Sequence, residues 1–206
     1  MSAMKFYLRI VHALEKINAP YMIVGAFAGW AFGVRRVTFD VDILVDLRAQ
    51  DLPALAAEFP LPRYYADPEM MRNSMRLGIM FNLIDTSEGV KADLVPMTRE
   101  PGYRAAFARR VRQTFEDEEG NRFDAWCAQP ADIIIGKLKA WTEGRSNKHP
   151  ADIHQMLVFS LSDLGTIQID QTLVTTEAAR LGSETLALWK ELVARAEAEV
   201  RKNKNG

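Results

Sequence analysis

The sequence predicts a mixed α/β (α+β) fold, in which a twisted sheet is flanked by helices and followed by a C-terminal helical region. Three observations predict it. Apolar residues recur at helical steps near the N-terminus, apolar and polar residues alternate over 37–46, and the chain from 130 onward is helical in pattern. With 206 residues, 48% of them hydrophobic, the chain can bury a substantial core. We expect an α/β domain over 1–126 and a helical region over 127–206.

The first elements follow from spacing and from helix-breaking residues. Over 2–18, apolar residues recur at steps of three and four, which predicts an amphipathic helix that ends before Pro20. The apolar run 21–24 predicts a buried strand. Gly25 interrupts this run, and the alanine-rich stretch 26–32 predicts a second helix.

Strict alternation predicts a strand over 37–46. One face is apolar and carries Val37, Phe39, Val41, Ile43 and Val45. The other face carries Thr38, Asp40, Asp42, Leu44 and Asp46. Since aspartate is depleted in strands, three aspartates on one strand face suggest a functional reason.

The next segments are less regular in pattern. A short helix is predicted over 52–59, and an irregular connection over 60–73. Two antiparallel strands, 81–84 and 90–95, are predicted on either side of the turn 85–89.

The second half of the chain begins with a further strand pair joined by a turn at Gly120 and Asn121. Helices are then predicted over 130–143, 150–160 and 176–202.

Composition excludes some classes of protein. The single Cys127 cannot form an internal disulfide, and no Cys/His spacing indicates zinc. The N-terminal stretch contains Lys5 and Arg9 and lacks the long uncharged run of a signal peptide or membrane span. We therefore expect a cytoplasmic protein with no membrane role.

A formal net charge of -1 excludes a globally basic nucleic-acid-binding protein. One local basic cluster is present in a segment that resembles a short helix, and it consists of Arg104, Arg109, Arg110 and Arg112. These arginines either bind phosphates or form a solvated surface, and the second interpretation is the more common for a run of charges.

The aspartates are candidates for metal binding. Asp40 and Asp42 are two residues apart on a strand, so their carboxylates project from one face and repel each other unless a cation neutralises them. Mg²⁺ prefers carboxylate oxygens together with phosphates and water. Asp93, on the predicted strand 90–95, supplies a third carboxylate, and three carboxylates can hold two ions about 3.5–4 Å apart. The alternative is a merely solvated strand face.

Two further positions are consistent with anion binding. Gly25 lies between a strand and a helix, where backbone N–H groups can bind phosphate, although an ordinary turn glycine is the alternative. Lys137 projects from the apolar face that Ile133 and Trp141 form on the predicted helix. A buried ammonium needs a partner, whereas the alternative is a lysine whose head group reaches solvent.

Three segments together resemble the DNA polymerase beta superfamily of nucleotidyltransferases. They are Val24-Gly25-Ala26, Arg36-Val37-Thr38-Phe39-Asp40-Val41-Asp42-Ile43 and Ala92-Asp93-Leu94. The superfamily signature is a hydrophobic residue with Gly-Gly or Gly-Ser, then Asp-x-Asp, then a third acidic residue on a later strand. The chain is most similar to bacterial minimal nucleotidyltransferases, including toxins of type IV toxin–antitoxin and abortive-infection systems. The resemblance extends over residues 20–160. Ala26 departs from it, because the family usually has Gly or Ser at this position and alanine lacks the hydroxyl with which serine could bind a phosphate.

The resemblance implies a transferase that moves a nucleoside monophosphate from a nucleoside triphosphate to an RNA, such as tRNA, or to a protein. It assigns two Mg²⁺ ions to Asp40, Asp42 and Asp93, which would be the catalytic residues. It assigns nucleotide binding to Gly25, Ala26, Arg36, Thr38, Lys137 and Asp152, with the helical region completing the nucleotide cleft. A cognate antitoxin protein is an implied partner. The rival interpretation is a catalytically silent module of this fold that binds a partner protein, and the sequence does not identify the base, the acceptor or the oligomeric state.

Overall fold

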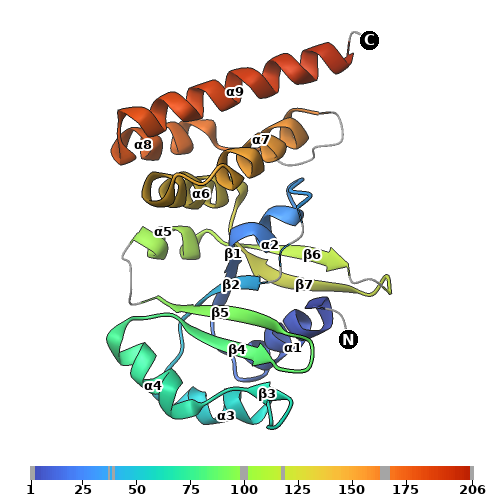
Figure 1. Ribbon diagram of the computed structural model, residues 1–206, viewed down its shortest axis with the longest axis vertical. Helices are drawn as coiled ribbons and strands as arrows, with labels where there is room; N and C mark the ends of the chain where they lie inside the picture. The colour runs from blue at the N-terminus through green and yellow to red at the C-terminus, as the bar shows by residue number, and fades with distance from the viewer. Residues whose placement is uncertain are drawn as a thin grey trace. The chain divides into compact units, whose positions relative to one another are not determined.

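The computed structural model describes residues 3–36, 38, 40–97, 102–116, 119–162 and 168–204. It separates the chain into two compact units (Figure 1). The first unit consists of residues 1–27 and 38–128, and the second of 28–37 and 129–206. The short helix α2 (Gly25–Trp30) begins in the first unit and ends in the second. The predicted division at 126/127 stays a prediction.

The first unit is built on a seven-stranded sheet in the order β3-β4-β5-β2-β1-β7-β6. In chain order its elements, apart from the start of α2, are α1 (Ala3–Lys16), β1 (Tyr21–Val24), β2 (Asp40–Val45), η1 (Ala49–Asp51), α3 (Leu52–Ala57), β3 (Tyr64–Tyr65), α4 (Pro68–Leu77), β4 (Phe81–Asp85), β5 (Val90–Pro96), α5 (Gly102–Ala108), β6 (Val111–Glu116) and β7 (Arg122–Cys127). β2 is antiparallel to β1 and parallel to β5. The mixed sheet with flanking helices confirms the predicted α/β class.

The register of the central strands places the predicted site residues together. Asp42 on β2 is aligned with Asp93 on β5, and Asp40 is aligned with Lys91. Asn82 on β4 is aligned with Asp93 from the other side. Because aligned residues of neighbouring strands project from the same face, these five polar side chains share one face of the sheet.

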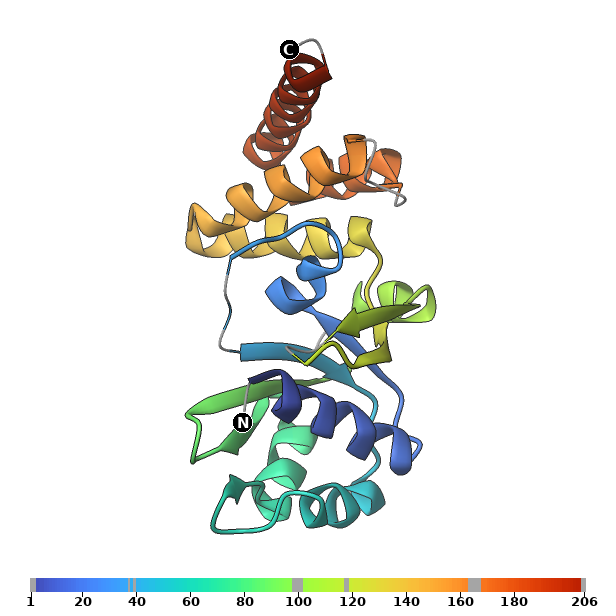
Figure 2. The ribbon, with the colours of Figure 1, turned by 90° about the vertical axis from the view of Figure 1, so that its right-hand side faces the viewer.

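The opposite face of the same strands is apolar and closed. Its side chains are at most 1% exposed, and they are Val41, Ile43, Ala92 and Leu94. Helix α1 packs against the sheet beside β5 (Figure 2) and buries Phe6, Ile10 and Leu14, as the helical spacing predicts. The alternation of buried and half-buried residues along β2 and β5 follows from this one-sided packing.

The irregular connection predicted over 60–73 is wrong, because β3 and α4 occupy much of it. Asp67 caps α4, since its side chain accepts hydrogen bonds from the backbone N–H groups of Glu69 and Met70. Pro68 occupies the first turn, and Gly78 ends the helix with a left-handed φ of 63°. These start and stop residues were visible in the sequence, but α4 is polar overall and buries only Met71 and Ser74, so its segment resembles a connection.

Other boundaries differ in detail. The described part of β2 begins at Asp40, and the predicted strand residues Val37 and Phe39 lie outside the described residues. The predicted helix over 52–59 is preceded by the 3-10 turn η1. The short helix predicted for the arginine cluster is α5, which ends at Ala108. Arg112 therefore lies in β6 and not in the helix.

The second unit is helical. After the end of α2, its elements are α6 (Pro130–Gly144), α7 (Lys148–Leu161), α8 (Gln171–Leu181) and α9 (Ser183–Lys204). The single helix predicted over 176–202 is wrong, since Gly182, with a φ of 126°, separates two helices. The indole N–H of Trp189 on α9 donates to Thr175 Oγ1 on α8 at 2.9 Å and joins the pair.

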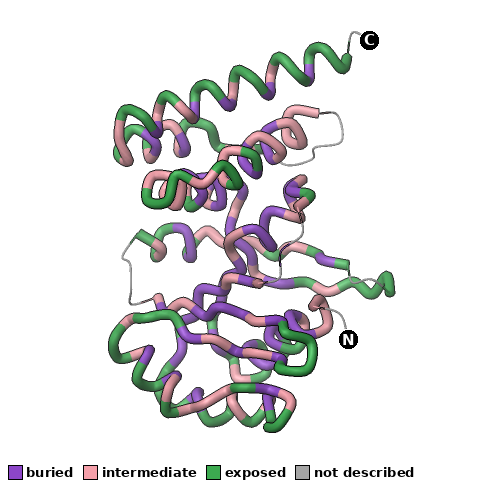
Figure 3. Tube along the Cα trace, viewed as in Figure 1, coloured by how far each residue is buried: buried purple, intermediate pink, exposed green. Residues whose placement is uncertain are grey.

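Both units contain buried residues (Figure 3). Each unit has its own apolar core, formed by α1 and the central strands in the first unit and by the facing sides of α6 to α9 in the second. Among the described residues, no helix combines the length and the apolar character needed to cross a membrane.

The β4–β5 turn depends on a fully buried carboxylate. Asp85 Oδ2 accepts a hydrogen bond from Arg63 Nη2 at 2.8 Å, and Oδ1 accepts one from Ser87 Oγ at 2.6 Å. Burial opposes ionisation, but these hydrogen bonds prevail, and the pKa of Asp85 lies below its usual value of 3.8. The charged carboxylate therefore stabilises the fold at neutral pH.

We predict that Asp85→Asn lowers the free energy of unfolding by about 2 kcal/mol at pH 7, because charge-assisted hydrogen bonds are lost. The folded-state pKa is depressed, so this contribution is present above the unfolded-state pKa and is lost as pH falls through the folded-state pKa. Urea unfolding at pH 7 and at stepwise lower pH measures it, and the difference between wild type and variant should shrink below about pH 4. The control Asp124→Asn changes an exposed position on β7, and its free energy of unfolding should stay close to that of the wild type.

Candidate active site

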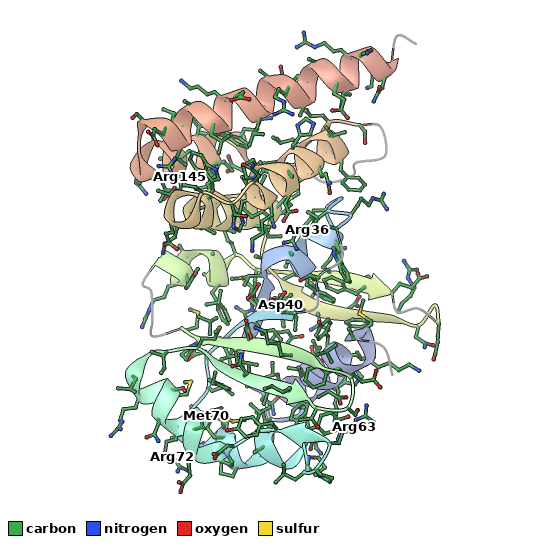
Figure 4. The ribbon with its side chains drawn as sticks, in the orientation of Figure 1. Arg36, Asp40, Arg63, Met70, Arg72 and Arg145 are labelled. Carbon is green, nitrogen blue, oxygen red and sulfur yellow. The ribbon has the colours of Figure 1, made fainter. Side chains whose placement is uncertain are left out.

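Asp40 and Asp42 lie at the start of β2 with half-buried side chains on the polar face of the sheet (Figure 4, where Asp40 is labelled). Thr38, which is 6% exposed, donates a hydrogen bond from Oγ1 to Asp40 Oδ1 at 2.6 Å. The expected pairing of two carboxylates on one strand face is therefore present. Thr38 fixes the orientation of the first carboxylate.

Asp93 is held by two neighbours on the same face. Its carboxylate is buried, and Lys91 Nζ lies 2.8 Å from Oδ1 and 2.7 Å from Oδ2. Asn82 Nδ2 donates to Oδ1 at 2.5 Å. Both carboxylate oxygens thus already accept hydrogen bonds from side chains of this chain.

Gly25 is packed directly against Asp42. Its φ of 71° is in the left-handed region, and a Cβ at this position would collide with the Asp42 carboxylate. Glycine is therefore required twice, once by the backbone conformation and once by the close approach of the carboxylate. Ala26, the departure from the family pattern, follows it as a buried residue.

Tyr7 adds an unusual group to the first unit. Its side chain is 1% exposed, and its hydroxyl lacks a hydrogen-bond partner in the described structure. Burial raises the pKa of Tyr7 to about 12, assisted by the negative charges of Asp40, Asp42 and Asp93.

The residues on this face partly fit the expected metal. Asp40 and Asp42 offer hard oxygen ligands from one strand face, the donor type that Mg²⁺ prefers. Within the described ranges, however, no group of three or more His, Cys, Asp or Glu side chains is arranged to hold a metal ion. Metal binding by Asp40, Asp42 and Asp93 stays a prediction, as does the expected number of two ions.

The remaining predicted site residues lie in the second unit and form a buried ionic cluster. Lys137 Nζ lies 2.6 Å from Asp152 Oδ2, and the two side chains are 5% and 1% exposed. Arg36 Nε donates to Asp152 Oδ1 at 3.0 Å. The structure therefore buries Lys137, as its helical position predicts, and gives it Asp152 as a partner. The nucleotide-binding roles of Arg36, Lys137 and Asp152 stay predictions.

The predicted basic cluster is partly engaged in contacts with protein groups. The Arg110 guanidinium lies over the ring of Phe107 at 4.2 Å and over that of Trp126 at 4.8 Å. Arg112 forms an ion pair with Glu15 at 2.6 Å. Arg110 and Arg112 therefore have partners within the protein, and the choice between phosphate binding and a solvated surface stays open.

Three residues of this site were missed by the sequence analysis. Lys91 could have been found, because it is two residues before Asp93 on an alternating strand and so shares its face. Asn82 requires knowledge of the β4–β5 register, and Tyr7 requires the packing of α1 on the sheet. A single strand pattern does not contain that information.

We predict that Gly25→Ala displaces the Asp42 carboxylate and weakens divalent-ion binding at least about 10-fold. The substitution should also lower the free energy of unfolding by about 1 kcal/mol, because alanine is strained in the left-handed backbone conformation. Calorimetric titration with Mn²⁺ measures the first effect. The matched control is Gly89→Ala, which has a similar φ of 66° but nothing within 4 Å of the added Cβ. Equal Mn²⁺ affinity in both variants would contradict the proposed contact.

We predict that Asp152→Asn destabilises the protein by about 3 kcal/mol, because it leaves the buried Lys137 ammonium without its anion. Chemical denaturation followed by circular dichroism measures the loss. Glu177→Gln, which removes an exposed ion pair with Arg180, should change stability by less than about 0.5 kcal/mol. A similar small change in Asp152→Asn would show that the buried cluster is not structural.

Comparison with protein-family models found no match, and comparison with curated proteins found none either. Solved structures gave distant similarities over most of the chain. The antibiotic-resistance factor ANT(2'')-Ia is 16% identical with a TM-score of 0.45, covering 98% of this chain and 97% of its own. An antigenic nucleotidyltransferase-like protein from Paracoccidioides brasiliensis is 15% identical with a TM-score of 0.47, covering 85% of each chain.

A third similar structure is JHP933 from Helicobacter pylori, which is 13% identical with a TM-score of 0.44 and is matched over 98% of this chain and 95% of its own. At these identities and scores the similarities do not assign this chain to a family. Its function has to be inferred from its own residues.

Proposed function

We propose that this protein is a metal-dependent nucleotidyltransferase that transfers a nucleoside monophosphate from a nucleoside triphosphate to an acceptor hydroxyl. The observation that carries the proposal is the in-register pairing of β2 and β5, which brings Asp40, Asp42 and Asp93 onto one sheet face next to Gly25. The order and spacing of these residues are those of the nucleotidyltransferase signature.

In this proposal Asp40 and Asp42 hold the divalent ion. A bound Mg²⁺ supplies Lewis-acid stabilisation of the charge on the phosphates and orients them. Thr38 keeps the Asp40 carboxylate in place through its hydrogen bond, and the absence of a Cβ at Gly25 leaves room for the Asp42 carboxylate. The ligands are therefore preorganised before substrate binds.

The reaction is an in-line displacement. The acceptor hydroxyl oxygen forms a bond to the α-phosphorus, the bond from that phosphorus to the bridging oxygen breaks, and pyrophosphate leaves with the electron pair. The hydroxyl proton passes to Asp93 and from there to water. Asp93 is suited to a position near the acceptor because Lys91 and Asn82 fix its carboxylate on the same face.

In the second unit, the proposal concerns two positively charged side chains. Lys137 and Arg36 are the candidate triphosphate-binding residues, and both share Asp152 as an anionic partner. Asp152 would then hold the two cationic side chains in defined orientations.

The acceptor and the biological setting rest on the motif pattern alone. The pattern is similar to that of toxins which modify RNA, and this extends the proposal to an RNA acceptor and to a cognate antitoxin. A protein acceptor is the second candidate, and the label-transfer experiment below distinguishes the two.

We expect label transfer from one of four α-labelled nucleoside triphosphates, with Mg²⁺, into total RNA or total protein of a bacterial lysate. Asp42→Asn should lower transfer at least about 100-fold, because it removes a metal ligand. Asp46→Asn, an exposed aspartate just after β2, is the matched control and should retain activity.

Label in RNA and not in protein would identify the acceptor class. No transfer with any triphosphate, or equal transfer by the Asp42→Asn variant, would overturn the proposal and favour a catalytically silent partner-binding module.

A further inference from the structure

We infer that the Lys91 ammonium takes the place of the second metal ion, so that the enzyme works with one divalent cation held by Asp40 and Asp42. The inference rests on the proposed function and concerns how its active site is neutralised. In this arrangement Lys91 would contact both the Asp93 carboxylate and the attacking oxygen of the acceptor.

The first support is the geometry at Asp93. Lys91 Nζ is within hydrogen-bond distance of both carboxylate oxygens, at 2.8 Å and 2.7 Å. Asn82 Nδ2 contacts Oδ1 from the neighbouring strand at 2.5 Å. A divalent ion bound by Asp93 would have to displace the ammonium or lie beside it, and two cations at that distance repel each other.

The second support is the position of Lys91 in the sheet. Lys91 is aligned with Asp40 on β2 and is two residues before Asp93, so all three side chains leave the same face. An ammonium at this position faces a cluster of carboxylates and not an isolated partner. A lysine ammonium that contacts both oxygens of a carboxylate carries its positive charge at neutral pH.

The third support is the pattern of exposure. The Lys91 side chain is 44% exposed, whereas that of Asp93 is 9% exposed. The ammonium is therefore anchored from within the sheet and remains open to solvent on the other side. An acceptor hydroxyl that approaches Asp93 from solvent would meet the ammonium, which can stabilise the negative charge that develops on the attacking oxygen.

The described residues also agree with a single ion site. Asp40 and Asp42 supply the one or two carboxylates with which Mg²⁺ is usually held in the presence of phosphates.

The experiment counts Mn²⁺ bound per chain by equilibrium dialysis with each of the four α,β-methylene nucleoside triphosphates. We expect one protein-bound ion in wild type and in Lys91→Arg, and two in Lys91→Met, where Asp93 becomes available. Lys16→Met, which removes an exposed lysine on α1, is the matched control and should bind one. Adding Asp93→Asn to Lys91→Met should return the count to one.

Two further readouts accompany the ion count. Without metal, Lys91→Met should lower the melting temperature relative to wild type, because the carboxylates lose their internal cation. In label transfer, Lys91→Met should be at least about 100-fold slower at saturating triphosphate, whereas Lys91→Arg should retain more activity.

Two ions in wild type, or one ion in both wild type and Lys91→Met, would overturn the inference while leaving the proposed transferase intact. No Mn²⁺ bound by wild type with any analogue would overturn both. Equal transfer rates in Lys91→Met and wild type would also overturn it, because the ammonium would then have no part in the reaction.

Discussion

The candidate site depends on the parallel pairing of β2 with β5. This pairing aligns Asp42 with Asp93 and Asp40 with Lys91, so charges that are about 50 residues apart in sequence meet on one face. A shift of one residue in either strand would send its polar side chains into the apolar face beneath α1. Burial of Val41, Ile43 and Leu94 on the apolar face therefore determines which side chains project from the polar face. The same strand register therefore determines both the hydrophobic core and the candidate site.

Two lysine–aspartate pairs among the described residues differ in their exposure to solvent. Lys137 and Asp152 in the second unit are 5% and 1% exposed, so both charges have lost most of their contact with water. Such a pair is strongly coupled to stability, because removal of either partner leaves a buried charge. Lys91 and Asp93 in the first unit are 44% and 9% exposed, and their charges remain accessible from solvent. The first-unit pair is therefore open to a ligand from solvent, whereas the second-unit pair joins α6 to α7 and also contacts Arg36.

The sequence predicted the elements whose pattern is local and strong. The strand with Asp40 and Asp42, the hairpin with Asp93 and the helix with Lys137 all follow from periodicity, and the structure contains them. Helix α4 was missed because its segment is polar overall and buries only Met71 and Ser74, although Asp67, Pro68 and Gly78 mark its ends. The break at Gly182 was missed because helical spacing continues across it. The neighbours of Asp93 could be anticipated only in part, since Lys91 shares its strand whereas Asn82 reaches it through pairing between strands.

Local irregularities in the first unit gather at the candidate site. Gly25 has a left-handed backbone against Asp42, Tyr7 buries a hydroxyl without a partner in the described structure, and three carboxylates lie on one sheet face. Each of these features is unfavourable for folding alone, and a sheet that served only as a scaffold would replace them with apolar packing. Proteins retain such conflicts mainly where function requires them. The neutralising contacts follow the same logic: Lys91 and Asn82 reduce the repulsion around Asp93, while Asp40 and Asp42 keep oxygen ligands on the polar face. The polar face thus places an internal cation at Asp93 and leaves the carboxylates of Asp40 and Asp42 beside it.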